Sequence, residues 1–492
     1  MPRDAVIGVD IGTSGSKGVL VGLDGEVIRS AVRVHTPDRP APGRFEMDAR
    51  VWWRECVALT RELTGPGDAD VVAVGISGMG PCVLLTDEDD EPLRPAVLYG
   101  VDTRSVRQIR HIEERLGAEE IVRRCGSALS TQAAGPKIAW IAEEEPGVYA
   151  RARRLYTTAG WLVGKLTGAY VLDHHSASQC TPLYDTHAHR WYAPWAAEVA
   201  PGLDLPPLRW SGEPAGTVTP EAARETGLPA GIPVTTGTID AWAEALSVGA
   251  HHTGDLMLMY GTTMFLLHTV DRPLTSPALW GTVGALPGTR NLAGGMATSG
   301  AVTDWLRDLS AGADHATLSR EAAASPPGAN GLLMLPYFAG ERTPLMDPDA
   351  RGVIAGLTLS HTRADLYRAA LEATGFGVRH NVETIEAAGG DIRRVVAVGG
   401  GTQGPLWPQI VSDITGLPQE VRAVTLGAAY GDALLAAQTV GEARVDDWNP
   451  VRETVHPRRE QAAVYDELYR LYRRLYEQTA DTVHTLAASQ QR

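Results

Sequence analysis

The sequence predicts a mixed α/β protein with two domains. Its 492 residues exceed what one ordinary hydrophobic core accommodates. The chain opens with a strand, a glycine-rich loop and two more strands joined at Asp24-Gly25, and helical segments alternate with strands further on. The stretch 254–268 (GDLMLMYGTTMFLLH) repeats the order of strand, Gly/Thr loop and strand. We therefore expect two related halves, and we place them at residues 1–247 and 248–492.

Local patterns predict the individual elements. Residues 5–9 (AVIGV) indicate a buried strand, and residues 52–65 (WWRECVALTRELTG) have helical spacing and end at a glycine. In the second half, Thr362 and Asp365 form a capping-box pattern at the start of a long helix, which the pair Gly389-Gly390 ends.

A packing helix is expected close to the C-terminus, with the first domain as one candidate partner for it. The apolar residues that recur there at three- and four-residue steps are Val464, Leu468, Leu471, Leu475 and Leu486, with several tyrosines beside them.

Composition excludes several classes of function. A formal net charge of -15 disfavours nucleic acid and anionic membranes as partners. The four cysteines are scattered without metal-ligand spacing, which is typical of a reducing compartment. The N-terminal stretch MPRDAVIGVD has an acid where a secretion signal would be apolar, and no apolar stretch is long enough to span a bilayer. We expect a cytoplasmic protein.

The opening loop has the composition of a phosphate-binding turn. After Asp10 come the small, hydroxyl-bearing and basic residues Gly12, Thr13, Ser14, Gly15, Ser16 and Lys17. Small residues let backbone N–H groups approach a phosphate closely, and the hydroxyls and the lysine add further donors. A carboxylate just before such a loop could hold a hard cation through water. The alternative is an ordinary turn whose aspartate accepts hydrogen bonds from the backbone.

A second loop and a second aspartate extend this interpretation. Gly261, Thr262 and Thr263 form a loop of similar size, so that two loops from two half-chains could clamp one nucleotide. Asp240 lies between them, where a strand ends and a helix begins. It could accept the proton of a hydroxyl that attacks phosphorus, or it could only cap the helix.

One motif competes with the interpretation of two phosphate-binding loops. The run GGGTQG at residues 399–404 matches G-x-G-x-x-G after a strand and before a helix. Glu420 follows it in the sequence at a spacing suited to an acid that binds a ribose hydroxyl. This pattern is typical of dinucleotide-dependent oxidoreductases. A flat glycine-rich surface could equally accept an adenine or a ribose. No zinc-protease helix and no G-x-S-x-G turn occurs in the sequence.

The whole set of motifs resembles a known family. In order, the segments are GVDIGTSGSKGVL, TGTIDAWAEALSVGA, YGTT, YFAGERTPLMDPDARGVIAGLTLSHTRADLYRAALEATGFG and VAVGGGTQGPLWPQIVSDITG. They resemble the signature segments of the FGGY carbohydrate kinases, in their xylulokinase-like form, along essentially the whole chain. The resemblance implies two actin-like (ribonuclease-H-like) domains with the active-site cleft between them, and ATP and Mg²⁺ as cofactors.

The resemblance also implies roles for individual residues. Asp10 would act with the metal, Gly12 to Lys17 would form the first phosphate loop, and Asp240 would be the general base. The other implied positions are Thr262 with its neighbours Gly261 and Thr263 for the second loop, Gly300, Gly400 and Gly401 for the adenosine pocket, and Met79, Gly80, Asp102 and Arg104 for the sugar.

Departures from the family pattern lie on the sugar side. Residues 79–82 (MGPC) replace a Gln-Met-His-Gly run, Ala241 replaces the asparagine after the base, and residues 99–102 (YGVD) replace a Trp-Asn-Asp stretch. Each change removes or moves a hydrogen-bond partner, and such partners set substrate discrimination.

We therefore expect an ATP-dependent kinase for a primary hydroxyl of a small sugar. D-xylulose is the first candidate, and another ketopentose, a polyol, gluconate or a glycerol-like substrate is the alternative. A homodimer is also implied by the resemblance. A non-catalytic sugar or nucleotide sensor and the oxidoreductase are the distant alternatives.

Overall fold

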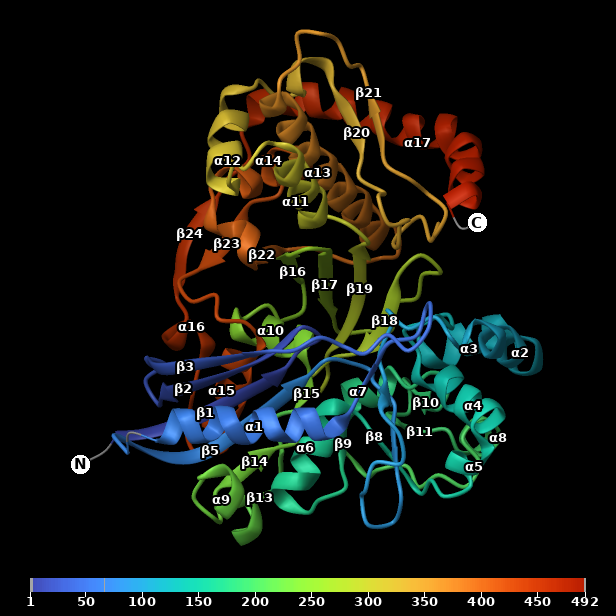
Figure 1. Ribbon diagram of the computed structural model, residues 1–492. Helices are drawn as coiled ribbons and strands as arrows, with labels where there is room; N and C mark the ends of the chain where they lie inside the picture. The colour runs from blue at the N-terminus through green and yellow to red at the C-terminus, as the bar shows by residue number, and fades with distance from the viewer. Residues whose placement is uncertain (1–2, 66, 491–492) are drawn as a thin grey trace.

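The N-terminal half is built on a seven-stranded sheet in the computed structural model, which describes residues 3–65 and 67–490. β1, β2 and β3 form an antiparallel meander, and β5 and then β14 lie parallel beside β1 (Figure 1). The strands are β1 (Arg3–Ile11), β2 (Gly15–Gly22), β3 (Val27–Val34), β5 (Ala69–Gly78), β13 (Pro214–Thr217), β14 (Pro233–Thr235) and β15 (Thr238–Ile239).

The C-terminal half has a second seven-stranded sheet with the same central topology. β16, β17 and β19 form the meander, and β22 and then β23 lie parallel beside β16. The strands are β16 (Asp255–Tyr260), β17 (Met264–Val270), β18 (Trp280–Val283), β19 (Arg290–Met296), β22 (Arg394–Val398), β23 (Gln419–Arg422) and β24 (Val451–Val455). The two related halves expected from the repeated strand–loop–strand pattern are therefore confirmed.

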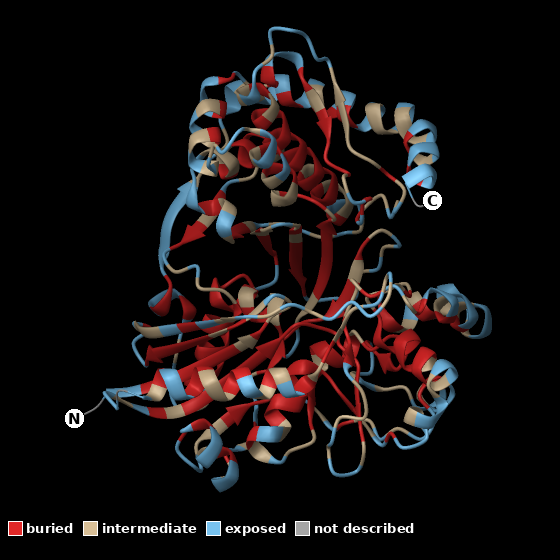
Figure 2. Ribbon diagram, viewed as in Figure 1, coloured by how far each residue is buried: buried red, intermediate tan, exposed pale blue. Residues whose placement is uncertain are grey.

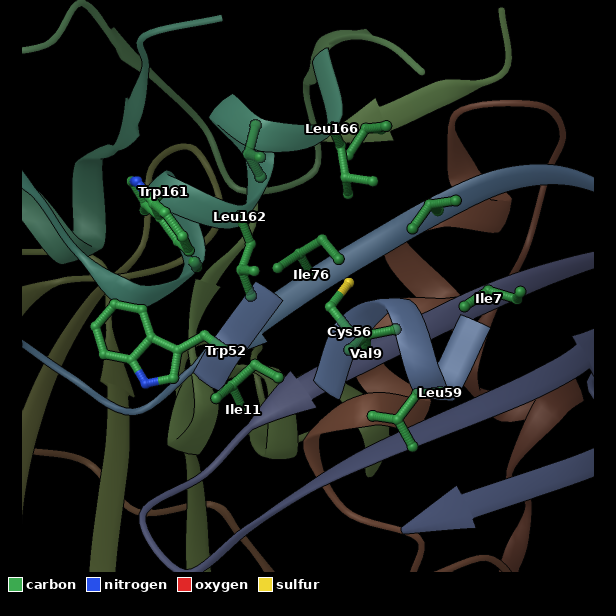
Figure 3. Packing of buried hydrophobic residues seen from close by; sticks show 14 of the residues in the cluster. Ile7, Val9, Ile11, Trp52, Cys56, Leu59, Ile76, Trp161, Leu162 and Leu166 are labelled. Atoms are coloured by element: carbon green, nitrogen blue, oxygen red, sulfur yellow. The ribbon is translucent and has the colours of Figure 1, made fainter. Parts of the chain in front are cut away.

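Alternation along β1 explains the packing of the N-terminal sheet. Side chains of a strand point to opposite faces in turn, while residues three and four apart share one face of a helix. One face of β1 packs on α1 (Ala49–Thr64), and the same face of the neighbouring strand β5 packs on α6 (Thr158–Thr167) (Figure 3). The residues in this contact are Ile7, Val9, Ile11, Trp52, Cys56, Leu59, Trp161, Leu162 and Leu166.

Two helices join the lobes by crossing each other. α15 (Ala428–Gln438) comes late in the chain but packs on the N-terminal sheet, so closely that a Cβ on Gly8 would lie 1.9 Å from the carbonyl oxygen of Ala429. α10 (Asp240–Ser247) packs on the C-terminal sheet, and a Cβ on Gly431 would lie 1.9 Å from the carbonyl oxygen of Ala243 where the two helices cross. The N-termini of both helices consequently lie at the junction of the lobes.

The last helix packs differently from one expectation. α17 (Ala462–Gln490) lies on β20 (Leu333–Leu335), α13 (Arg363–Ala387) and α14 (Leu406–Thr415) of the C-terminal half, at the end of the molecule away from the N-terminal sheet (Figure 1). Packing on the first domain was therefore a wrong expectation, and α15 makes that contact instead. Much of α17 is exposed or half-buried (Figure 2). Its buried residues include Tyr465, Tyr469 and Tyr472, whereas Leu471 and Leu486 are exposed.

The remaining elements connect and cover the two sheets. The other helices are α2 (Val106–Leu116), α3 (Ala118–Cys125), α4 (Ala134–Glu144), α5 (Pro146–Tyr149), α7 (His174–Ser178), α8 (Ala193–Val199), α9 (Pro220–Thr226), α11 (Gly300–Leu309), α12 (His315–Ala324), α13 (Arg363–Ala387), α14 (Leu406–Thr415) and α16 (Val445–Trp448). The short strands are β4 (Glu46–Met47), β6 (Leu84–Thr86), β7 (Ala96–Val97), β8 (Arg154–Tyr156), β9 (Leu172–Asp173), β10 (Tyr184–Asp185), β11 (Arg190–Trp191), β12 (Leu208–Arg209), β20 (Leu333–Leu335) and β21 (Val353–Ala355). Within the described ranges, no helix is both long enough and apolar enough to cross a membrane.

Candidate active site between the two lobes

An open cavity of about 430 Å³ lies between the two halves of the chain. The N-terminal half contributes its charged residues, which are Asp10, Lys17, Asp240 and Glu244. Asp10 lies near the end of β1, directly across from Lys17 on β2. Asp240 is the first residue of α10, and Glu244 follows one helical turn later on the same face.

Few neutralising partners reach these carboxylates. One Asp10 oxygen accepts a hydrogen bond from the Ser77 hydroxyl at 3.0 Å. One Asp240 oxygen accepts a hydrogen bond from the Ala241 N–H at 2.8 Å. Lys17 is the cation whose charge acts on both Asp10 and Glu244. The wall is therefore rich in negative charge.

Burial among like charges gives these groups unusual proton affinity. Burial, followed by the charge of Asp10, raises the pKa of Asp240 to about 8. Burial also raises the pKa of Asp10 to about 6, against the opposing effects of Ser77 and Lys17. For Glu244, burial and then Asp10 raise the pKa to about 7. Groups that change protonation near neutral pH are suited to acid–base work.

A fourth carboxyl lies behind this wall. Asp432 is fully buried on α15, and its Oδ2 lies 2.6 Å from the Ser77 hydroxyl oxygen. Among the described residues its Oδ1 has no hydrogen-bond partner, and burial, with the Asp10 charge next, raises the pKa of Asp432 well above its usual range. Burial therefore favours the neutral form of this carboxyl, and through Ser77 Asp432 links a helix of the C-terminal half to Asp10.

The C-terminal wall of the cavity is formed by glycines, short turns and apolar side chains. The N-terminus of α15 contributes Gly427 and Ala428, and the loop after β16 contributes Gly261. That loop also receives the N-terminus of α11, because the N–H of Gly300 donates to the Gly261 carbonyl at 2.9 Å. Helix N-termini and small residues favour the approach of anions.

The glycine run at residues 399–401 has a packing role as well. A Cβ on Gly399 would lie 2.5 Å from the carbonyl oxygen of Tyr260, and one on Gly401 would lie 2.8 Å from the Tyr260 Cβ. At Gly400 nothing lies within 4 Å of the same position, and Gly400 lines the cavity. Glu420 lies within β23 and faces Arg394 at 3.6 Å. The spacing of the motif thus follows from close packing against the end of β16.

The structure brings together only part of the predicted site. Of the residues predicted for phosphate, metal and catalysis, the cavity is lined by Asp10, Lys17, Asp240, Gly261 and Gly400. The first loop is shorter than expected, because residues 15–17 belong to β2. Ser16 points to the opposite face from Lys17 and donates to Glu55 at 2.5 Å, so its expected part in the loop was wrong. The second loop is the turn Gly261–Thr263.

The residues predicted for the sugar are engaged inside the N-terminal half. Met79 is buried in the core. The buried Arg104 guanidinium donates to Asp102 at 2.8 Å and to Glu46 at 2.6 Å. The Gly80 carbonyl accepts a hydrogen bond from Gln132 at 3.2 Å. Their roles toward a sugar stay predictions.

Sequence reasoning missed two parts of the cavity wall. Glu244 could have been found from its spacing of four residues from Asp240 on a helix. The segment 425–428 has a weaker signal, which is a glycine directly before an alanine-rich helix. Asp432 was detectable only as a lone acid in the otherwise small and apolar run of α15.

Comparison with known proteins assigns the family. A model of the N-terminal domain of the FGGY family of carbohydrate kinases matches residues 5–247, and a model of its C-terminal domain matches residues 256–440. The chain belongs to the FGGY family of carbohydrate kinases. The two-domain α/β fold with the cleft between its halves, and a kinase with an alcohol group as acceptor, are thereby confirmed.

Three members of the FGGY family illustrate how far the similarity extends. A xylulose kinase of Escherichia coli is 29% identical over 487 residues, which cover 96% of this chain and 98% of that one. A glycerol kinase of Nocardia farcinica is 32% identical over 463 residues, which cover 89% and 91%. The crystal structure of a xylulose kinase from Rhodospirillum rubrum superposes with a TM-score of 0.90 at 32% identity, over 98% of this chain and 100% of that one.

Proposed function

We propose that this kinase transfers the γ-phosphoryl group of ATP to a primary hydroxyl of a small sugar, with D-xylulose as the first candidate. The product would be D-xylulose 5-phosphate. The observation that carries the proposal is the Asp240 carboxyl, which opens on the cavity between the two lobes with its pKa raised to about 8. This chain matches xylulose kinases over nearly their whole length, both in sequence and in structure, and this match supports the choice of sugar.

Asp240 is the general base of the proposed reaction. As the sugar oxygen attacks the γ-phosphorus, the carboxylate accepts the hydroxyl proton, and the bond between that phosphorus and the bridging oxygen of ADP breaks. A carboxylate with a raised pKa is a stronger base than an exposed aspartate, since its basicity lies nearer to the working pH. Closure of the lobes would exclude water, which otherwise competes as acceptor.

ATP would lie against the glycine-rich wall. The loops at Gly12–Ser14 and Gly261–Thr263 would hold its phosphates from both sides, together with Lys17 and the N-terminus of α15. Gly300, Gly400 and Gly401 would line the adenosine pocket. Gly400 suits this role because the space above it is open.

Asp10 fits the second proposed cofactor, Mg²⁺. Its Oδ1 is occupied by Ser77, whereas Oδ2 has no hydrogen-bond donor in the part of the chain that the structure describes. A hard oxygen ligand of this kind, on a wall with few cations, suits a magnesium ion held partly through water. When bound, the ion would neutralise charge on the transferring phosphoryl group.

The sugar side of the site would be formed by Met79, Gly80, Asp102 and Arg104. These residues would act by contact with the sugar and also indirectly, by supporting neighbouring segments. The Asp102 N–H donates to the Tyr99 carbonyl at 3.0 Å, and the Tyr99 hydroxyl lies 2.8 Å from the Thr13 hydroxyl. The buried Asp102–Arg104 pair therefore supports a segment that contacts the first loop.

An ADP-release assay over a panel of sugars tests the proposal. The panel holds D-xylulose, D-ribulose, L-xylulose, gluconate and glycerol, with phosphorus NMR of each product and with Asp240→Asn as the inactive control. We expect the highest kcat/KM with D-xylulose. A higher kcat/KM with another member would replace D-xylulose, and no sugar-dependent ADP release would overturn the kinase reaction and favour a sensor.

We also propose a cytoplasmic homodimer that binds neither nucleic acid nor membrane. Its four cysteines are all buried thiols without disulfides, and its net charge is -15. Light scattering after size-exclusion chromatography tests the dimer.

The division of the chain into domains at residues 1–247 and 248–492 also stays a proposal. It is supported by the end of α10 at Ser247.

A further inference from the structure

The first phosphate loop is attached to a buried histidine–glutamate pair. His35 follows β3 directly, and Glu55 lies on α1. The Nε2 of His35 lies 3.0 Å from the Gly12 carbonyl oxygen, and its Nδ1 lies 2.8 Å from Glu55 Oε2. The two side chains are 7% and 10% exposed. The Ser16 hydroxyl donates to the same Glu55 oxygen at 2.5 Å.

Hydrogen-bond chemistry fixes the orientation of the imidazole. A carbonyl oxygen only accepts, so Nε2 must carry a proton and donate to Gly12. The Nδ1 contact then shares one proton between the ring and Glu55, whichever group holds it. Both ring nitrogens are engaged, which fixes the ring plane much as an outer partner fixes a metal-binding histidine.

The main chain of His35 adds a second attachment. Its N–H donates to the Ser14 carbonyl at 3.2 Å. The carbonyls at both ends of the loop Gly12–Ser14 are thus bound by one residue. Within the loop itself, the Gly12 N–H donates to the Gly15 carbonyl at 3.0 Å.

This attachment determines where the Thr13 N–H points. A peptide unit is planar and trans, so the Thr13 N–H points opposite to the Gly12 carbonyl. His35, Glu55 and Ser16 lie on the α1 side of the sheet, whereas Lys17 faces the cavity on the other side. The Thr13 N–H is therefore directed away from α1, and no acceptor for it occurs among the residues that the structure describes.

We propose that His35, held by Glu55, is a positioning residue that orients the first loop for the phosphates of ATP. The inference rests on the proposed function, in which this loop contacts ATP. His35 touches neither substrate nor reacting atoms, and it acts through the peptide between Gly12 and Thr13. Its effect should therefore appear in the affinity for ATP and not in the affinity for the sugar.

Binding and kinetics of three variants test this role. For His35→Ala we expect the Kd of a non-hydrolysable ATP analogue, measured by calorimetry, and the KM for ATP to rise about tenfold, the effect of leaving the Gly12 carbonyl without its hydrogen-bond donor. The KM for the sugar should change less than about twofold. His35→Gln keeps a donor within reach of Gly12 and should restore part of the affinity, and Glu55→Gln should lie between the wild type and His35→Ala.

A second histidine–carboxylate pair supplies the control. His484 donates from Nε2 to Asp347 at 2.7 Å, on α17 and far from the loop in the chain. His484→Gln should leave the KM for ATP unchanged, whatever it does to the melting temperature. A folded His35→Ala protein with wild-type affinity for the analogue would overturn the proposal. If His35→Ala does not fold, equal ATP affinity of the wild type, His35→Gln and Glu55→Gln would overturn it. Failure of the wild type itself to bind the analogue would instead overturn the proposed function.

Discussion

The two loops occupy equivalent places in the two sheets but carry different residues. In the N-terminal sheet Asp10 stands two residues before Gly12 and pairs across the strands with Lys17. In the C-terminal sheet Met259 stands two residues before Gly261 and pairs with Phe265. Asp10 and Met259 both line the cavity. One topology therefore presents a charged pair on one side of the site and the apolar Met259 on the other.

This difference separates two tasks. The N-terminal wall collects carboxylates whose pKa values are raised toward neutrality by burial, which suits proton transfer, and their ionised forms can bind a cation. The C-terminal wall exposes glycines, backbone and the N-terminus of α15, as binding of a nucleotide requires. If the account is right, changes to the carboxylates of the first wall should mainly affect turnover, and changes to the glycines and backbone of the second should mainly affect ATP affinity.

Removal of the proposed base should have the largest effect. Asp240→Asn keeps the shape of the side chain but cannot accept the hydroxyl proton, so kcat should fall by about a thousandfold. The Kd of ATP should stay within about twofold, because the substitution leaves the glycine wall unchanged. Activity assays measure kcat, and calorimetry measures the Kd of ATP. A variant that retains a tenth of the activity would remove Asp240 from the mechanism.

Transfer of a carboxylate to the other wall should break the asymmetry. Met259→Asp places a negative charge where we expect the nucleotide, and the KM for ATP should rise by about tenfold to a hundredfold through charge repulsion and lost packing. Met259→Leu is the matched control, because it preserves volume and apolar character, and its KM should be near that of the wild type. Equal KM values for the two variants would contradict the placement of ATP.

The pH dependence should report the charged wall. Asp240 must be ionised to accept a proton, so kcat/KM should increase with pH, by about tenfold per unit below its pKa, and level off near pH 8. A profile that is flat between pH 6 and pH 8 would be inconsistent with a base whose pKa is about 8.

A smaller effect is expected on stability. The pKa of Glu244 is raised to about 7 in the folded protein, so the folded state holds a proton that the unfolded chain has released. Its ionisation therefore lowers stability as the pH rises from the unfolded pKa through the folded one. Glu244→Gln removes this penalty and should raise Tm by a few degrees at pH 8 and by much less at pH 5. A lower Tm at pH 8 would show that Glu244 makes a stabilising contact.

Signals confined to a short stretch of sequence were sufficient for much of the fold. The capping box of Thr362 and Asp365 is present at the start of α13, and the turn at Asp24-Gly25 joins β2 to β3. Both depend on neighbours within a few residues. The apolar stripe predicted for α17 was misjudged, because tyrosines occupy the buried side and Leu471 is 45% exposed.

Contacts between distant parts of the chain were beyond the reach of sequence patterns. Ser77 and Asp432 are 355 positions apart, and their hydrogen bond depends on the packing of α15 across the lobes. His35 lacks any motif that connects it to Gly12. Asp10 and Asp240 were recognisable because each stands at the end of a strand next to a glycine loop or a helix start, where chemistry is concentrated.

A crystal structure with a non-hydrolysable ATP analogue and the sugar that turns over fastest would test the central claim most directly. We predict the analogue's phosphates between the two loops, and the Asp240 carboxylate within about 3 Å of the sugar's primary hydroxyl oxygen. A γ-phosphate bound outside the space between the loops, or a hydroxyl hydrogen-bonded to another residue with Asp240 out of reach, would contradict it.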